Sequence, residues 1–279
     1  LPLANISVVN SDYYEENGLV SAIGERPYIS LKNPKEIDKM VRMSVGEMLT
    51  NIIWSPIDNI EDINSVANWM WSSTSMEDAY LLDNAVDSLC NIVKEIGISI
   101  NGGKDSLSMK VKNGKEEIKG PNTLVISGYT NTYDFGKIIT PNLKRINTEL
   151  VLIRFDNLIG RGLGGSCFET IIEDIDLPLF SNLSFKTPDL VSSATFKKVF
   201  ESIQYLIRNE MILSGHDISD GGLITTLCEM SISSGIGIDI DINIKNNYNL
   251  QNNKDDNYLL KYFDLFFNEE LGIVIEIES

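Results

Sequence analysis

A glutamate and an asparagine stand four residues apart in the segment Gly46–Asn51. Apolar residues recur around this segment every three or four positions, which predicts a helix over Pro34–Ile53. Side chains four apart project from one face of a helix, so Glu47 and Asn51 would present two oxygen atoms together. Oxygen ligands suit a hard cation such as Mg²⁺ better than zinc. A helix with an ordinary polar outer stripe explains the same spacing.

A second group of polar residues lies between a predicted strand and a predicted helix, in Gly215–Gly222. Ser219 or Asp220 could simply cap the helix, but capping does not explain Asp217 at the strand end, where ligand groups often lie. His216 is the only histidine, which excludes a multi-histidine zinc site. Beside a turn, a structural role suits it better than that of a general base.

Two glycine-rich segments, Asn101–Ser106 and Gly160–Ser166, could bind phosphate. Glycines let backbone N–H groups approach an anion, and Lys104 would add a point charge. The first segment is not a P-loop, because the required spacing is missing and Asp105 follows the lysine. The second precedes a predicted helix, whose N-terminus favours anions. An ordinary turn explains either segment as well.

The mixture of predicted strands and helices indicates two α+β domains. The expected strands are Ile6–Val9, Leu19–Ile23, Asn64–Met70, Ile98–Ile100, Ser108–Val111 paired with Leu124–Thr130, Glu149–Phe155, Met211–His216, Ile236–Ile242 and a last one that includes Ile275–Ser279. The other expected helices are Met76–Ile96, one that ends near Glu173, Asp189–Glu210 and Gly222–Ser233. Asn101–Ser106 is expected to be a loop, Pro141–Asn147 a linker, and the asparagine-rich Asn243–Asn257 a surface insertion without function.

The composition excludes several classes of partner. A net charge of −17 over 279 residues argues against binding to nucleic acid or to an anionic membrane surface. The apolar runs are far shorter than the roughly 20 residues of a membrane helix. Three cysteines without metal-like spacing favour a reducing compartment, so we expect a cytoplasmic protein. Because the chain starts at Leu1 and stops within an expected strand, we also expect a piece of a larger protein, truncated at its C-terminus.

Five motifs occur in an order that resembles the phosphoribosylformylglycinamidine synthase family, in its large single-chain form. They are Gly46–Asn51, Asn68–Trp71, Gly102–Met109, Ser214–Leu223 and Phe267–Gly272. Together they span nearly the whole chain and are far more specific than any one alone. The resemblance implies a two-domain unit like aminoimidazole ribonucleotide synthetase. Its half-barrel-forming domain would be 1–140, and its α/β-sandwich domain 148–279, incomplete at the end.

The resemblance also implies a function. The family is an ATP-dependent ligase of purine biosynthesis that converts formylglycinamide ribonucleotide to the amidine, with ammonia from a glutaminase domain. This chain resembles the second of two tandem synthetase copies, which pack as a pseudo-dimer. The first synthetase half and the glutaminase domain of the same full-length chain are therefore the implied partners, nucleotides the implied substrates, and the chain alone is expected to be inactive.

The second copy in this family holds an auxiliary ATP or ADP with Mg²⁺. Carried over by motif, the implied metal ligands are Asn5, Glu47, Asn51 and Asp217, and the implied nucleotide contacts are Ala4 and Ser219. Asn5 stands where the family usually has aspartate, so it brings an amide oxygen without charge. Gly103, Lys104 and Ser106 are implied to complete the catalytic site of the other copy, with Gly103 as a nucleotide contact.

Two alternatives remain open. The chain could be a nucleotide-loaded scaffold with no part in catalysis, and Lys104 and Ser106 would distinguish this from a catalytic role. It could also be a homodimeric sister enzyme, such as aminoimidazole ribonucleotide synthetase or selenophosphate synthetase. Gly102–Ser106 and Asn68–Trp71 are not typical of those relatives.

Overall fold

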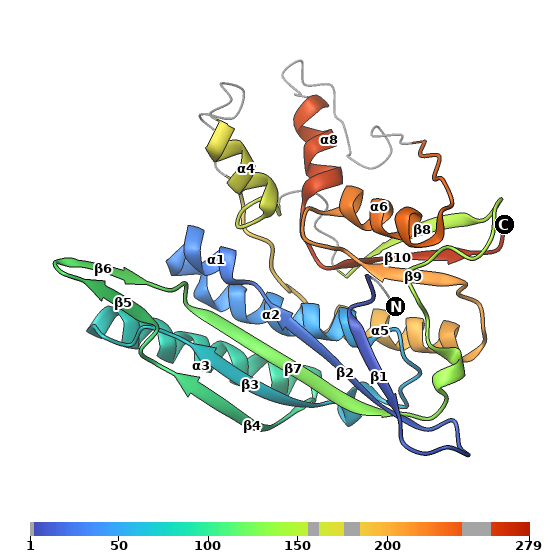
Figure 1. Ribbon diagram of the computed structural model, residues 1–279, viewed down its shortest axis with the longest axis horizontal. Helices are drawn as coiled ribbons and strands as arrows, with labels where there is room; N and C mark the ends of the chain where they lie inside the picture. The colour runs from blue at the N-terminus through green and yellow to red at the C-terminus, as the bar shows by residue number, and fades with distance from the viewer. Residues whose placement is uncertain (1–2, 156–161, 176–184, 242–257) are drawn as a thin grey trace.

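Two β-sheets with helices between and beside them organise the chain (Figure 1). The structure is a computed structural model that describes residues 3–155, 162–175, 185–241 and 258–279. One hydrophobic core runs through both sheets, since residues of the first sheet and Phe155, Phe196 and Ile273 belong to a single buried cluster. The predicted α+β fold is confirmed.

The first sheet has five strands in the order β1-β2-β7-β3-β4. Their bounds are β1 Ile6–Asn10, β2 Gly18–Glu25, β3 Asn64–Met70, β4 Ser99–Ser106 and β7 Thr123–Thr132. All neighbours are antiparallel except β3 and β4, which are parallel. A separate hairpin, β5 Lys110–Asn113 with β6 Glu116–Lys119, projects from one end (Figure 1).

The second sheet has three antiparallel strands, β8 Glu149–Arg154, β10 Gly272–Ile277 and β9 Ser214–Asp217, with β10 in the centre. The helices α4 Cys167–Ile175, α6 Leu223–Ser234 and α8 Tyr258–Phe267 lie on the side away from the first sheet (Figure 1). On the other side, α5 Ser193–Arg208 contacts α3 Met76–Ile96. β9 contacts α2, so its last residue, Asp217, lies close to the boundary between the two layers.

Helix α2, Ile37–Ile52, lies between the two sheets (Figure 1). Twelve of its 16 residues are buried, so the helix has little outer face. On one side, a Cβ at Gly24 of β2 would lie 2.1 Å from the Ser44 carbonyl oxygen. On the other, a Cβ at Gly46 would lie 2.2 Å from the Leu271 side chain. The two glycines thus allow α2 to approach both layers, which places Glu47 at their boundary.

Local signals set the ends of α3, and here the prediction is confirmed. The Ser75 hydroxyl accepts a hydrogen bond from the Asp78 N–H (3.1 Å), and the Asp78 carboxylate accepts one from the Ser75 N–H (3.2 Å). This capping box satisfies N–H groups of the first turn. The helix stops at Gly97, whose φ of 95° is a left-handed conformation that glycine adopts readily.

The expected loop at Asn101–Ser106 is wrong, because these residues belong to strand β4. Their glycines, asparagine and aspartate disfavour a strand locally, but parallel pairing with β3 overrides that preference. A Cβ at Gly103 would lie 2.2 Å from the Ala67 carbonyl oxygen, so the glycine is needed for the close approach of the two strands.

Other expectations also differ from the structure. β7 pairs with β2 and β3, not with the segment near Ser108, because β5 has its own partner in β6. Residues 236–241 form no strand. Ile236 and Ile238 alternate because they pack against a small buried cluster that includes Leu223, Leu227 and Met230 of α6. Helix α1 Pro27–Lys32 and helix α8 were not predicted. Gly160, Arg161, Ile242 and the asparagine-rich 243–257 lie outside the described residues.

The segment expected to be a linker, 141–147, has no helix or strand and is held by one carboxylate. Glu276 of β10 accepts hydrogen bonds from the N–H of Lys144 (2.9 Å), the N–H of Arg145 (3.2 Å) and the hydroxyl of Thr148 (2.9 Å). Burial raises the pKa of Glu276, but these hydrogen bonds, led by that from Lys144, outweigh burial and lower it below 4.5.

Glu276→Gln should destabilise the protein at pH 7 by about 1–3 kcal/mol, because hydrogen bonds to a buried charged group are lost or weakened. A lowered pKa in the folded state stabilises the fold above the unfolded pKa, and this stabilisation is lost as pH falls through the folded value. The difference in the free energy of unfolding between wild type and Glu276→Gln should therefore be smaller in acid than at pH 7. Urea unfolding at pH 7 and pH 3.5 measures it, with the exposed Glu278→Gln as control. A gap that stays constant with pH would contradict this.

Candidate nucleotide and metal site

A cavity of about 560 Å³ opens between the N-terminal segment, β2, α2 and the turn after β9. That volume is in the range of small-molecule sites. All six residues implied for the auxiliary site line this cavity: Ala4, Asn5, Glu47, Asn51, Asp217 and Ser219. They come from segments more than 160 residues apart in the sequence, and the fold brings them together.

The side-chain oxygen of Asn51 is oriented and buried in a way that suits a metal ligand. Its side-chain amide donates a hydrogen bond to the Ile23 carbonyl oxygen (2.8 Å), which fixes the orientation of the group. Its Oδ1 atom is buried and has no hydrogen-bond partner, although the residue is only 5% exposed. Buried oxygens in folded proteins are nearly always satisfied. A cation would satisfy this one.

Glu47 is a buried carboxyl group beside a cation. Its Oε2 atom accepts a hydrogen bond from the Glu25 N–H (2.9 Å) and lies 3.2 Å from Nε of Arg26. Burial raises the pKa of Glu47 to about 7, although the charge of Arg26 and the hydrogen bond from Glu25 act in the opposite direction. The alternative of a solvated polar stripe is excluded, since this side chain is largely covered.

Asp217 lies at the end of β9 and is held from two sides. The Asn5 amide nitrogen lies 3.1 and 3.0 Å from its two carboxylate oxygens, and Nδ1 of His216 lies 3.1 Å from Oδ1. The other ring nitrogen of His216 is 3.3 Å from the Glu229 carboxylate. Burial lowers the pKa of His216, but the hydrogen bond to Asp217 and the charges of both carboxylates outweigh it and raise the pKa. His216 is thus placed to orient carboxylates.

Ser219 follows Asp217 on the turn and points its hydroxyl toward the same cavity. The hydroxyl donates a hydrogen bond to the Glu229 carboxylate, and the Ser219 N–H donates to the Thr226 hydroxyl (2.9 Å). Glu229 also lines the cavity. The loop that carries Asp217 and Ser219 is therefore tied to helix α6 by side chains.

The side-chain oxygens of the cavity suit a hard cation only if a bound phosphate group or water completes its coordination. Among the described residues, no three His, Cys, Asp or Glu side chains form a ready metal site. Five carboxylates line the cavity; two of them, Glu47 and Asp217, are implied metal ligands, and Asn5 and Asn51 add two amides. Mg²⁺ typically binds one or two protein carboxylates and takes its remaining oxygens from water and phosphates. For Asn5 to join, its oxygen must face the site in place of the amide nitrogen that now faces Asp217.

Lys104, Ser106 and Gly103 do not line this cavity. The strand registers place Lys104 beside Asn68, Asn68 beside Val125, and Val125 beside Glu25, all on the sheet face that α2 does not cover. Three inter-strand spacings make roughly 14 Å between the backbones of Lys104 and Glu25. Ser106 lies on the same face, next to Met70, and Gly103 alternates to the other.

Comparison with known proteins supplies the family. Residues 1–131 match the model of the FGAR-AT PurM_N-like domain, and residues 148–277 match that of the AIR synthase related protein, C-terminal domain. The whole chain is 35% identical to a probable phosphoribosylformylglycinamidine synthase of Arabidopsis thaliana and 31% identical to the phosphoribosylformylglycinamidine synthase of Homo sapiens. The chain belongs to the phosphoribosylformylglycinamidine synthase family.

The relatives in this family are much longer than the chain. It covers 18% of the Arabidopsis protein and 19% of the human one, so it spans about one fifth of their length. Among solved structures, T. maritima PurL complexed with FGAR matches 99% of the chain, which covers 40% of PurL, with a TM-score of 0.66 and 13% identity. AaThiL complexed with AMPPCP and TMP matches with a TM-score of 0.57 and 10% identity, and the chain covers 79% of it. These similarities confirm the aminoimidazole-ribonucleotide-synthetase-like fold.

Four charged residues in or around the cavity were not predicted: Glu25, Arg26, Glu229 and Glu269. Arg26 directly follows β2, and no spacing pattern in the sequence marks it. Glu269 belongs to the family motif Phe267–Gly272, which was the one signal that could have drawn attention to it.

Proposed function

We propose that the chain is a synthetase unit of a phosphoribosylformylglycinamidine synthase and that its cavity binds ATP or ADP with Mg²⁺ as an auxiliary nucleotide. The observation that carries this proposal is the meeting of Glu47, Asn51 and Asp217 around one cavity. Support also comes from the fold, since PurL structures with the same fold were solved as complexes with ATP and with ADP.

Each side of the cavity has a separate task in this proposal. Asn51 and the Glu47 carboxylate, both on α2, hold the cation from one side, and Asp217 holds it from the other. Ser219 and the backbone at Ala4 contact the nucleotide. Bound Mg²⁺ would supply the positive charge that the phosphates need in a cavity with several carboxylates.

The catalytic contribution belongs to the complete enzyme. We infer that Lys104 and Ser106 complete an active site with the first synthetase half, in which formylglycinamide ribonucleotide and ATP react with ammonia from the glutaminase domain. The open face of the first sheet supports such a partner, because Leu19 and Ile23 project from it 48% and 55% exposed. An apolar face of this kind favours a protein neighbour.

A nucleotide-loaded scaffold with no part in catalysis is the second candidate. The observation that favours it is the position of Lys104 and Ser106 outside the nucleotide cavity, on an exposed edge strand. The two candidates agree on nucleotide binding and differ only in the role of β4.

The cytoplasmic location stays a prediction. Within the ranges that the structure describes, no helix is sufficiently long and apolar to cross a membrane. One relative is named as a chloroplastic/mitochondrial protein.

Titration of the purified chain with ADP tests the proposed function. Calorimetry should detect one ADP site in the presence of Mg²⁺ and none in EDTA. Mass spectrometry and the absorbance ratio of the protein as purified should show whether adenine nucleotide is already bound. An absence of heat with both ADP and ATP, in nucleotide-free protein with Mg²⁺, would refute the proposal.

Asn5→Asp should have opposite effects with and without metal. The amide nitrogen of Asn5 now lies about 3 Å from both oxygens of Asp217, so an aspartate there would bring two carboxylates together. Like charges at this separation repel, which should lower Tm in EDTA. A third carboxylate should also tighten binding of Mg²⁺ with ADP, and raise Tm above wild type when both are present. Equal Tm changes under both conditions would contradict a metal role for position 5.

A further inference from the structure

We propose that Arg26 is a positioning residue, which sets the spacing between the two halves of the metal-binding set. This inference rests on the proposed magnesium-nucleotide role of the cavity. Arg26 directly follows β2 in the first layer, whereas Asp217 ends β9 and Ser219 lies on the turn after it in the second. It is only 7% exposed, which is unusual for a charged side chain and requires close partners.

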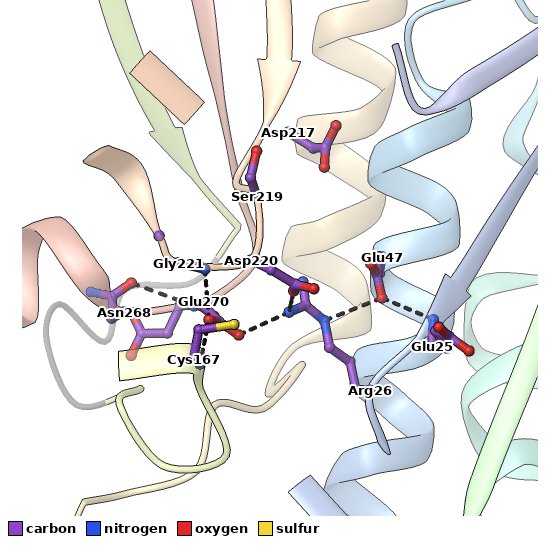
Figure 2. A network of polar contacts seen from close by, with 12 residues as sticks. Glu25, Arg26, Glu47, Cys167, Asp217, Ser219, Asp220, Gly221, Asn268 and Glu270 are labelled. Carbon is purple, nitrogen blue, oxygen red and sulfur yellow. Dashed lines mark hydrogen bonds and ion pairs between the residues drawn. The ribbon is translucent and has the colours of Figure 1, made fainter. Parts of the chain in front are cut away.

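Three carboxylates surround the guanidinium group. Nε lies 3.2 Å from Glu47, and one terminal nitrogen lies 2.8 Å from Asp220 and 3.2 Å from Glu269. Figure 2 shows Arg26 between Glu47, on α2, and Asp220, on the turn. Nε makes no hydrogen bond to Glu47, so that contact is an ion pair, whereas the terminal nitrogen donates hydrogen bonds to both Asp220 and Glu269. One rigid guanidinium thus joins carboxylates of both layers.

Glu269 extends this network to the backbone of the turn. Its other carboxylate oxygen accepts hydrogen bonds from the Gly221 N–H (2.8 Å) and from the Cys167 N–H (2.9 Å) at the start of α4. Gly221 has a φ of 91°, in the region that other residues rarely adopt, so this hydrogen bond holds an unusual backbone conformation. Asp217 and Ser219 precede that point by four and two residues.

The consequence is a continuous chain of contacts from one side of the cavity to the other. It runs from Glu47 through Arg26 to Glu269 and then to the turn at Gly221. If Arg26 is removed, Glu47 and Glu269 are left buried without their common cation, which is strongly unfavourable. The carboxylates would then move apart or turn away, and the cavity would lose the geometry that holds a cation between α2 and β9.

Arg26 variants of the full 279-residue chain test this role. Arg26→Gln should weaken the binding of ADP in Mg²⁺ by at least tenfold. Arg26→Lys should restore part of the affinity, because it keeps the charge but not the fixed directions of the donors. The affinity is measured by calorimetry in Mg²⁺ and in EDTA, and circular dichroism checks that each variant is folded.

Arg42 offers a matched control. It lies on α2, is 24% exposed, and joins the layers through two hydrogen bonds to Asp189 (2.7 and 2.8 Å), but it does not line the nucleotide cavity. Arg42→Gln should lower Tm and leave the affinity for ADP in Mg²⁺ within about twofold of wild type. An equal loss of affinity in both arginine variants would overturn the inference, because general loosening of the layers would then explain it.

Glu269→Gln covers the case in which Arg26→Gln does not fold. A glutamine can still accept the hydrogen bonds of Gly221 and Cys167 but no longer pairs with the charge of Arg26, so it too should weaken binding in Mg²⁺. Wild-type affinity in folded Arg26→Gln, or in both Arg26→Lys and Glu269→Gln, would overturn the inference and leave the proposed function intact. Failure of the wild type itself to bind nucleotide would instead refute the proposed function.

Discussion

Replacing Glu47 by Gln and Asp217 by Asn in one protein should abolish magnesium-dependent nucleotide binding. Both substitutions keep the shape of the side chain and remove the charge. All four proposed metal ligands, at positions 5, 47, 51 and 217, would then be neutral amides. Wild type with ligand at 100 times Kd gains about 2.7 kcal/mol of stability from binding, and the double variant should lose that gain. Thermal unfolding with and without Mg²⁺ and ADP measures the difference.

Glu25→Gln is the matched control for this experiment. Glu25 lines the same cavity and also carries a carboxylate, but only its backbone N–H contacts a proposed ligand. Its replacement should leave the ligand-induced rise in Tm nearly unchanged. If the double variant shows the same rise in Tm as wild type, Glu47 and Asp217 do not hold the cation and the site is assigned wrongly.

Lys104→Ala should lower kcat/KM of the complete enzyme by roughly 10² to 10³, the typical effect of losing one group that stabilises transition-state charge. Phosphoryl transfer depends almost entirely on positioning and electrostatic stabilisation, so a lysine at the proposed shared active site should have a large influence on the rate. The substitution should not change the fold, because Lys104 projects from an exposed edge strand. Steady-state kinetics with formylglycinamide ribonucleotide and ATP measure it in the complete protein that contains this chain.

Lys112→Ala serves as the control, since Lys112 is an exposed lysine on the nearby hairpin strand β5 and has no proposed role. It should retain wild-type kinetics. Wild-type kinetics in Lys104→Ala as well would leave the scaffold candidate as the function of this unit, with nucleotide binding unaffected. Ser106→Ala then provides an independent check, because its side chain lies on the same sheet face.

The sequence predicts well which residues gather at the cavity, because several of them carry local signals. Glu47 and Asn51 share a helix face by their spacing alone, and Asp217 ends a strand before a glycine-containing turn. The family motifs then related these two segments, and the structure places both at one cavity. How these residues serve a bound ligand stays a prediction.

What the sequence does not predict depends on contacts between distant segments. Residues 101–106 have a loop-like composition, and only the neighbouring strand β3 makes them a strand. The ion pair between Arg26 and Glu269 joins residues 243 positions apart, and no periodic pattern records such a pairing. Residues 236–241 were predicted to be a strand and are not one, since the alternation of apolar residues arises there from packing against a buried cluster.

The division of the cavity between the two layers has a consequence for assembly. Glu47 and Asn51 come from the first layer, and Asp217 and Ser219 from the second, so neither layer offers a complete pocket before they meet across α2. Under the proposed function, a nucleotide would therefore bind only a molecule whose two layers have docked. Its binding free energy would then add to the free energy that holds the layers together.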